Sequence, residues 1–260
     1  MEPDNPCREM TTQWKPKNRI KKTSFLKKAT GISTSFKFPE RRENTLPIAT
    51  KSPNKELKLP IVSKELHQKC DKSICPNILK SLAYETIDRY NPGSIKAYTD
   101  GSAENATTNG GYGSFICIPE KNTPISLYGP CGKHSNNYDA EIIAIIKTIN
   151  ELDKGFRDNT IKPTDVVILT DSQSALEAIT SFKDKPASLI EQLIQTCHST
   201  SENHQIQIFL QWIPGHCDIF GNEKADSLAK LGSKMPQPDE KTRYNSAKLI
   251  AKQHSKTIWN

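Results

Sequence analysis

The sequence predicts an α/β fold: a mixed five-stranded sheet flanked by helices, preceded by an irregular basic extension. Three observations lead to this prediction. Three strand patterns separated by turn residues lie between residues 94 and 128. A helical pattern over 139–152 then leads into a short apolar run at 166–169. Because a helix that connects two strands in this way implies parallel pairing, the sheet should contain both antiparallel and parallel strands.

The first three strands are predicted at 94–102, 111–118 and 125–128. Asn91-Pro92-Gly93 is a strong turn signal before the first of them, and Pro119 and Pro124 bracket the turn before the third. Short connections of this kind join antiparallel neighbours. We therefore expect three strands joined by hairpins.

Helices and parallel strands then alternate to the end of the domain. The helix at 139–152 carries Ile142, Ile145, Ile146 and Ile149 at helical spacing, and the run at 165–170 suits a strand that is buried on both faces. Further helices are predicted at 172–182, 187–201 and 221–231, with a last strand at 206–212.

Composition divides the chain into three parts. Residues 1–90 are rich in Lys, Pro, Ser, Thr and Asn with little periodicity, so we expect mostly irregular structure there, apart from a short helix starting near Pro76. Residues 91–234 form the predicted domain. Residues 235–260 form a Lys-rich tail with no predicted function.

The positive charge is concentrated before the predicted domain. Residues 1–93 hold 19 Lys and Arg against 10 Asp and Glu, and the stretch 14–28 contains seven basic residues and no acid, interleaved with Trp14 and Phe25. Such a stretch would attract a polyphosphate. A solvated, disordered tail explains the same composition, and both interpretations stay open.

The remaining composition predicts a soluble, intracellular protein with reduced thiols. No long apolar run or secretory signal is present, and the seven cysteines are scattered and odd in number. His67, Cys70 and Cys75 could bind zinc, but no fourth ligand is evident and the spacing is not that of a common zinc finger. A weakly ordered segment that happens to hold cysteines is favoured.

Four carboxylates in different structural settings are the candidate site. They are Asp100 in Thr-Asp-Gly-Ser, Glu141 in Ala-Glu, Asp171 in Thr-Asp-Ser-Gln and Asp226 in Ala-Asp. Hard divalent cations prefer clustered oxygen ligands, so four acids brought together could hold two such ions. That arrangement suits the cleavage of phosphodiesters.

Each acid also has an ordinary structural interpretation. Asp100 could pair with Lys96, and Glu141, in the first turn of its helix, could stabilise the helix N-terminus. Asp171 could cap the helix that starts near Ser172. Asp226 could pair with Lys230, four residues further along the last helix. Only the joint occurrence of the four favours the metal site.

The motifs and their order resemble a type 1 ribonuclease H domain over residues 94–234. The resemblance lies in Thr99-Asp100-Gly101-Ser102, Ala140-Glu141, Thr170-Asp171-Ser172-Gln173 and Gly215-His216 followed by the segment 221–226. The domain is similar to those at the 3′ end of non-long-terminal-repeat retrotransposon polyproteins. The resemblance implies a ribonuclease H-like fold and an endonuclease that hydrolyses the RNA strand of RNA/DNA hybrids, leaving 5′-phosphate and 3′-hydroxyl ends.

The resemblance also implies cofactors and residue roles. Two Mg²⁺ ions, with Mn²⁺ as an alternative, would be held by Asp100, Glu141, Asp171 and Asp226, and His216 would shuttle protons or ease product release. Contacts to the 2′-hydroxyl would come from Gly101, Ser102, Asn137 and Gln173. The stretch 183–186 is too short and too weakly basic to form the hybrid-binding handle of some members, so the basic stretch at 14–28 is a hypothetical substitute.

The expected partner is an RNA/DNA hybrid duplex, with no membrane association, and we expect a monomer. Two other functions compete with hybrid cleavage. A nucleic-acid-binding module could keep the fold and lose catalysis, although the presence of all four acids argues against this. A DNA strand-transfer enzyme shares the fold and the metal chemistry, but the spacing of the acids and the segment 215–226 favour ribonuclease H.

Overall fold

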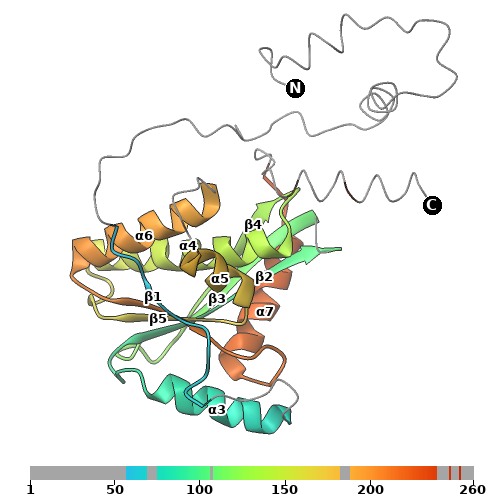
Figure 1. Ribbon diagram of the computed structural model, residues 1–260. Coiled ribbons are helices and arrows are strands. Elements are labelled where there is room, and N and C mark those ends of the chain that lie inside the picture. The colour runs from blue at the N-terminus through green and yellow to red at the C-terminus, as the bar shows by residue number, and fades with distance from the viewer. Residues whose placement is uncertain are drawn as a thin grey trace, which may run out of the picture.

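The computed structural model describes residues 57–68, 75–105, 108–181 and 188–238, together with Ser246 and Lys252 (Figure 1). The basic stretch 14–28, Cys70 and most of the tail 235–260 lie outside these residues, so the predictions made for them are not tested. Among the described residues, no helix is long and apolar enough to cross a membrane.

The sheet has six strands in the order β1-β6-β5-β2-β3-β4. Their bounds are β1 Ile61–Ser63, β2 Ile95–Glu104, β3 Thr108–Cys117, β4 Ile125–Gly132, β5 Val166–Thr170 and β6 Ile208–Trp212. Strands β2, β3 and β4 are antiparallel neighbours, whereas β1, β6, β5 and β2 run parallel to one another. The predicted mixed sheet is confirmed.

The prediction of five strands was wrong by one. The additional strand, β1, pairs with β6 at the edge of the sheet. It is three residues long and lies in a segment whose composition is typical of irregular structure. Three residues are too few to show the alternation of apolar and polar residues that predicts a strand. Its pairing depends on the tertiary neighbour and not on local propensity.

Helices cover both faces of the sheet. Their bounds are α3 Pro76–Asp88, α4 Asn137–Arg157, α5 Gln173–Thr180, α6 Ser188–His204 and α7 Phe220–Ser233. Helices α4, α5 and α6 lie on one face, and α3 and α7 lie on the other (Figure 1). The helix predicted to begin near Pro76 is therefore present, and it packs on the domain.

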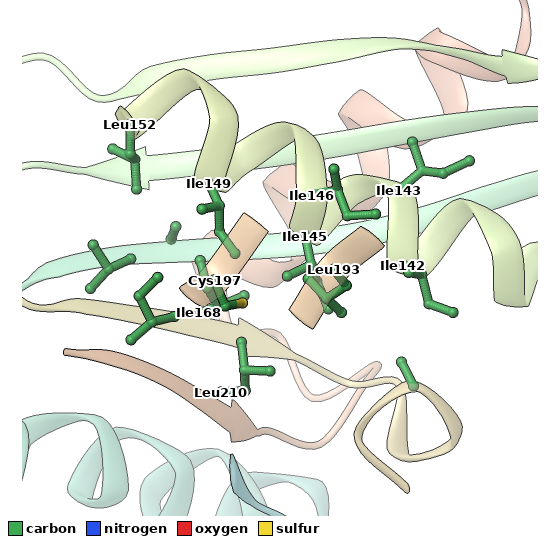
Figure 2. Packing of buried hydrophobic residues seen from close by; sticks show 14 of the residues in the cluster. Ile142, Ile143, Ile145, Ile146, Ile149, Leu152, Ile168, Leu193, Cys197 and Leu210 are labelled. Atoms are coloured by element: carbon green, nitrogen blue, oxygen red, sulfur yellow. The ribbon is translucent and has the colours of Figure 1, made fainter. Parts of the chain in front are cut away.

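The main core lies between α4, α6 and the sheet, as Figure 2 shows. Strand residues 166–169 are all buried, as expected for a strand covered on both faces. The apolar stripe of α4 meets β5 and β6 through Ile168 and Leu210, and meets α6 through Leu193 and Cys197. The stripe consists of Ile142, Ile145, Ile146, Ile149 and Leu152. This burial fixes the rotation of α4 about its own axis.

The second core cluster joins the segment before residue 90 to the domain. Leu79, Ala83 and Ile87 of α3 pack with residues of β2 and β5 that point away from α4. The buried side chain of Gln211 adds polar contacts, since its amide donates to the carbonyl of Glu65 at 3.0 Å and its oxygen accepts from the Tyr90 hydroxyl at 2.8 Å. The described part of 57–88 is thus tied to the sheet. The predicted boundary at residue 90 remains a prediction.

Helix α7 approaches β3 closely because β3 presents glycines to it. A Cβ placed at Gly113 would lie 2.2 Å from the carbonyl oxygen of Ala225, and one at Gly111 would lie 2.0 Å from the backbone nitrogen of Ser233. Both atoms belong to the backbone of α7, which cannot yield locally. Gly113 also pairs with Asp100 across the sheet, so the contact sets the distance between α7 and the candidate site.

Gly113→Ala should therefore destabilise the fold. The added methyl group must displace α7, and overpacking of this kind costs about 1–3 kcal/mol of unfolding free energy. The measurement is the denaturant midpoint. Gly93→Ala is the control, because its Cβ would meet only the side-chain oxygen of Asn91, at 3.3 Å. Equal midpoints for the two variants would contradict the close contact between α7 and β3.

Candidate active site

Two of the four candidate acids follow directly from the register of two parallel strands. Thr99 of β2 pairs with Thr170 of β5, so Asp100 and Asp171 each occupy the next position on adjacent strands. Both therefore lie toward the carboxyl ends of parallel strands, the edge at which open α/β sheets bind ligands. The sheet alone brings these two carboxylates together.

Glu141 reaches the same place from α4. A Cβ at Gly101 would lie 2.2 Å from the backbone nitrogen of Glu141, so only glycine lets α4 approach β2 immediately after Asp100. The helix begins at Asn137, earlier than predicted. Glu141 therefore lies in the second turn, and its expected place in the first turn was wrong. The acid in the first turn is Asp139, so an electrostatic role at the N-terminus belongs to Asp139.

Asp100, Glu141 and Asp171 form a compact carboxylate cluster. Each offers one oxygen, and these three oxygens all lie within 4.8 Å of one another. Asp100 is only 8% exposed, and one oxygen of Glu141, Oε2, is buried without a hydrogen-bond partner. Three oxygen ligands with an unsatisfied buried lone pair fit a hard divalent cation such as Mg²⁺. The ordinary alternative for Asp100, an ion pair with Lys96, is not formed among the described residues, and Asp100 Oδ1 accepts from the Gly101 N–H at 2.9 Å.

The cluster holds protons more tightly than ordinary carboxylates. Burial, followed by the charge of Asp171, raises the pKa of Asp100 to about 7. The pKa of Glu141 is raised well above its usual range by burial and then by the charges of Asp100 and Asp171. Burial also raises the pKa of Asp171. A cation bound among the three would favour their ionised forms.

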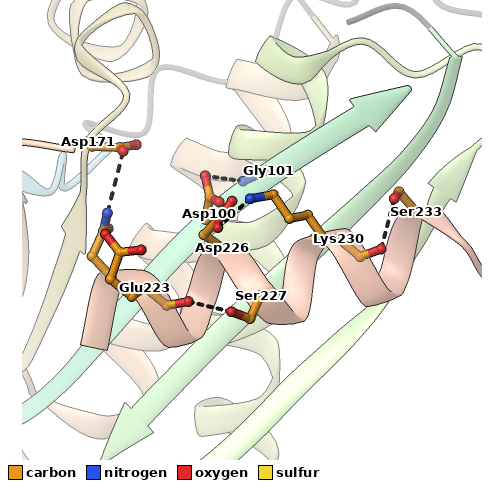
Figure 3. Close-up of polar contacts among 9 residues, drawn as sticks. Asp100, Gly101, Asp171, Glu223, Asp226, Ser227, Lys230 and Ser233 are labelled. Atoms are coloured by element: carbon orange, nitrogen blue, oxygen red, sulfur yellow. Dashed lines mark hydrogen bonds and ion pairs between the residues drawn. The ribbon is translucent and has the colours of Figure 1, made fainter. Parts of the chain in front are cut away.

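Asp226 stands beside the cluster but is not part of it. Its Oδ2 accepts from Lys230 Nζ at 2.6 Å. This is the i,i+4 ion pair that the sequence offers as the ordinary structural interpretation of Asp226. Figure 3 shows Lys230 lying along α7 with its ammonium group at Asp226, next to Asp100. The negative charge of Asp226 raises the pKa of both Asp100 and Asp171, so it acts on the cluster electrostatically. The structure brings together three of the four acids and leaves the fourth paired to a lysine.

Asp171 is held by groups from the last strand and the last helix. The amide of Asn222 donates to Asp171 Oδ2 at 3.5 Å, and the indole N–H of Trp212 donates to its backbone oxygen at 3.2 Å. A Cβ at Gly215 would lie 2.4 Å from Asp171 Oδ2, so the loop after β6 contacts the carboxylate directly. The N-cap of α5 is Ser172, which leaves the side chain of Asp171 free of the capping role that was its alternative.

His216 lies on that same loop, exposed and close enough to affect the cluster. A positive charge on His216 lowers the pKa of Asp171. His216 has φ of 56° and Asp218 has φ of 55°, a left-handed conformation that non-glycine residues rarely adopt. Strain of this kind is common where a loop presents side chains for function.

Comparisons with known proteins agree with this geometry. The model of the RNase H family matches residues 92–234. The chain is 30% identical over 152 residues to a ribonuclease H of Halorhodospira halophila, covering 54% of this chain and 93% of that protein. The chain belongs to the RNase H family.

Other relatives are similar at lower identity. A ribonuclease H of Nitrosomonas eutropha is 28% identical over 149 residues, covering 53% of this chain and 88% of that protein. Among solved structures, RNase H1 of Halobacterium salinarum has 18% identity and a TM-score of 0.42, covering 54% of this chain and 97% of that one. The membership of the RNase H family rests on the sequence matches.

The residues expected to contact the 2′-hydroxyl surround the cluster. Gly101 follows Asp100 on β2, and half-buried Ser102 follows it opposite Gly111. Asn137 is exposed at the start of α4. Gln173 starts α5, and its backbone N–H donates to the carbonyl of Asp171 at 3.1 Å. Their roles in this RNase H family member remain predictions.

Two residues at the site were missed by sequence reasoning. Asn222 lies within the segment 221–226 that carries the resemblance, but the resemblance predicts no role for it. Its buried amide contacts Asp171. Asn136 is the N-cap of α4, where its side-chain oxygen accepts from the Asp139 N–H at 2.9 Å. An Asn three residues before an acid at the start of a helical pattern is a capping signal that could have identified it.

The zinc alternative finds no support in the described residues. The ring of His67 contacts the Thr86 hydroxyl at 3.3 Å and the Glu85 carboxylate at 3.2 Å. Cys75 is exposed before α3, and Cys70 lies outside the described residues. His67 thus serves to hold the β1–α3 connection against α3.

Asp100→Asn should stabilise the metal-free protein at pH 8 and leave it nearly unchanged at pH 4. Because the folded-state pKa is raised above the unfolded value, the folded state binds more protons between about pH 4 and pH 7, and stability falls as pH rises through that window. Removing the titrating group should add on the order of 2 kcal/mol at pH 8.

The measurement is urea unfolding in chelator at both pH values. Added Mg²⁺ should reduce the difference in unfolding free energy between Asp100→Asn and wild type at pH 8, because it stabilises the native wild-type cluster more than the variant. Wild type and variant of equal stability at pH 8 in chelator would show that the carboxylates are not forced together as described.

Proposed function

We propose that this RNase H family member hydrolyses the RNA strand of RNA/DNA hybrids with two divalent metal ions. The observation that carries the proposal is the carboxylate cluster itself. Asp100, Glu141 and Asp171 occupy the motif positions of the family and offer oxygens within 4.8 Å of one another. The relatives named ribonuclease H support the same activity.

The four acids would hold Mg²⁺, or alternatively Mn²⁺. When bound, such ions lower the pKa of a water and stabilise negative charge on the leaving 3′ oxygen, which gives 5′-phosphate and 3′-hydroxyl ends. Asp100, Glu141 and Asp171 would hold the ions through the oxygens that lie within 4.8 Å of one another. Asp226 would also contribute to holding them, and would first have to exchange its 2.6 Å contact with Lys230 for the cation.

Residues outside the cluster would orient the substrate and move protons. His216, exposed on the loop that contacts Asp171, would hold or release a proton at the edge of the site. Asn222 and Trp212 would keep the Asp171 side chain and backbone in place. Backbone and side-chain groups of Gly101, Ser102, Asn137 and Gln173 would contact the RNA 2′-hydroxyl, the group that distinguishes RNA from DNA.

A cleavage assay tests the proposal. Labelled RNA/DNA hybrid, double-stranded DNA and single-stranded RNA are incubated with the protein in Mg²⁺ or in chelator. We expect cleavage only of the RNA strand of the hybrid, and only with metal. Asp100→Asn should lower the rate at least about 10³-fold, because metal ions contribute several kcal/mol to transition-state stabilisation.

The other outcomes distinguish the competing functions. Binding of hybrid without cleavage by the wild type would indicate a silent binding module. Joining or nicking of DNA would indicate a strand-transfer enzyme. Asp158→Asn serves as the matched control, since Asp158 is an exposed acid at the far end of α4 and its loss should leave cleavage unchanged.

We also propose that the basic stretch 14–28 holds the hybrid through its phosphates. The region matched by the family model begins at residue 92, so this stretch lies outside it. Deleting residues 1–90 would also remove β1 and α3, which pack on the sheet. Replacing the seven basic residues of the stretch by Gln in the full chain is therefore the cleaner change.

The substituted chain should bind hybrid more weakly and with a flatter dependence on salt. Each lost phosphate contact lowers the slope of log K against log salt by about 0.9. Hybrid-binding titrations from 50 to 200 mM salt, about the range over which such contacts are felt, give the slope. An unchanged slope would favour the solvated tail. The retrotransposon origin also remains a proposal, since the matched relatives are bacterial.

A further inference from the structure

A buried polar cluster joins a residue of the C-terminal tail to the start of α4. Ser246 Oγ donates to Asp139 Oδ2 at 2.8 Å and accepts from Asn136 Nδ2 at 3.1 Å. The same Asn136 amide lies 3.2 Å from Asp139 Oδ2. Asn136, Asp139 and Ser246 are 4%, 3% and 2% exposed. Three polar side chains thus satisfy one another away from water, although Ser246 lies more than 100 positions from the other two.

A second contact ties the chain after α7 to the same region. Gln237 Oε1 accepts from the backbone N–H of Gly132 at 3.0 Å, and Gln237 Nε2 donates to the carbonyl of Ser233 at 3.0 Å. Gly132 ends β4 and begins the connection to α4. Both tail residues therefore contact the β4–α4 connection, at its start and at its end.

The location of these contacts matters because of what α4 carries. Asn137, the predicted 2′-hydroxyl contact, lies between Asn136 and Asp139, and Glu141 of the carboxylate cluster follows Asp139 by two residues. The N-cap hydrogen bond from the Asp139 N–H to Asn136 fixes the backbone of this turn. Ser246 contacts the capping side chain of Asn136 and the carboxylate of Asp139, so its hydroxyl acts on the turn that presents Asn137.

Gln237 and Ser246 both lie beyond residue 234, where the match to the RNase H family ends. The contacts therefore involve residues outside the part of the chain that the family model matches. Buried networks of this kind contribute most when every member is satisfied, and loss of one member removes hydrogen bonds in a place where water cannot replace them. Without the Ser246 hydroxyl, Asp139 Oδ2 would keep its 3.2 Å contact with the Asn136 amide and lose the shorter bond of 2.8 Å.

We propose that Ser246 is a positioning residue for the hybrid-binding end of α4. Its hydroxyl locks the Asn136–Asp139 turn, and through that turn it sets the place of Asn137 against the RNA strand. The described tail residues Gln237 and Ser246 thus belong structurally to the domain. This inference rests on the proposed hybrid cleavage for its kinetic consequence, but its structural part is independent of any activity.

The test compares Ser246→Ala with Thr148→Val in the full chain. Thr148 is a buried residue of the same helix whose hydroxyl donates to the carbonyl of Ala144 at 2.7 Å, so its loss removes a buried hydroxyl far from the N-terminal turn. The first measurement is amide hydrogen exchange without substrate. We expect Ser246→Ala to speed exchange of the Asp139 amide and its neighbours about tenfold, whereas Thr148→Val should leave these amides unchanged.

The second measurement separates KM from kcat on RNA/DNA hybrid. Ser246→Ala should raise KM about fivefold, with kcat within about twofold of wild type, because the hydroxyl orients a substrate contact and not the reacting atoms. Thr148→Val should alter neither constant. A Ser246→Ala protein with unchanged exchange at the turn, or with unchanged KM in an active enzyme, would overturn the proposal. Should the wild type not cleave hybrid, the proposed function fails, and the exchange result still decides whether Ser246 locks the turn.

Discussion

The repulsion among three close carboxylates, one buried and two half-buried, is the constraint around which the structure is organised. Asp100, Glu141 and Asp171 cannot all ionise close together in a poorly solvated place without compensation, which explains why the pKa of each is raised. The carboxylates stay close despite their electrostatic repulsion because the elements that carry them cannot move apart. Two acids stand on adjacent strands in fixed register, and the third is on a helix packed along its whole apolar stripe.

One positive charge stands close to the cluster within the protein. Exposed Lys230 pairs with Asp226, and the pKa of Lys230 is raised first by the hydrogen bond to that carboxylate. Asp100 and Asp171 accept hydrogen bonds from Gly101 and Asn222, whereas Glu141 Oε2 is buried without a hydrogen-bond partner. One acid is paired with a lysine and three are left together, an arrangement that suits the proposed binding of cations from solution. The three clustered acids are held in place before any substrate arrives, and only Asp226 would have to exchange its contact.

Much of the fold and of the candidate site could be predicted from the sequence. The parts that could not be predicted have one physical reason in common. The isoleucine stripe of α4, the buried run of β5 and the four acids are local patterns whose period or spacing is visible in one segment. Strand β1 is three residues long and forms only because β6 offers it an edge. The contact of Asn222 with Asp171 and the partnership of Ser246 with Asp139 join positions 51 and 107 residues apart, and no local period encodes them.

The described fold extends beyond the part of the chain that resembles the family. On the N-terminal side, Gln211 shows how a segment outside the family match contacts the domain. It is buried in β6, and its amide donates to the carbonyl of Glu65, which precedes the family match at residue 92. Without that segment the amide would keep only its 2.7 Å contact to the Trp212 carbonyl. Trp212 in turn donates to the backbone of Asp171. These contacts thus connect the segment before the domain, through Gln211 and Trp212, to the backbone of Asp171, so residues outside the shared fold hold residues inside it.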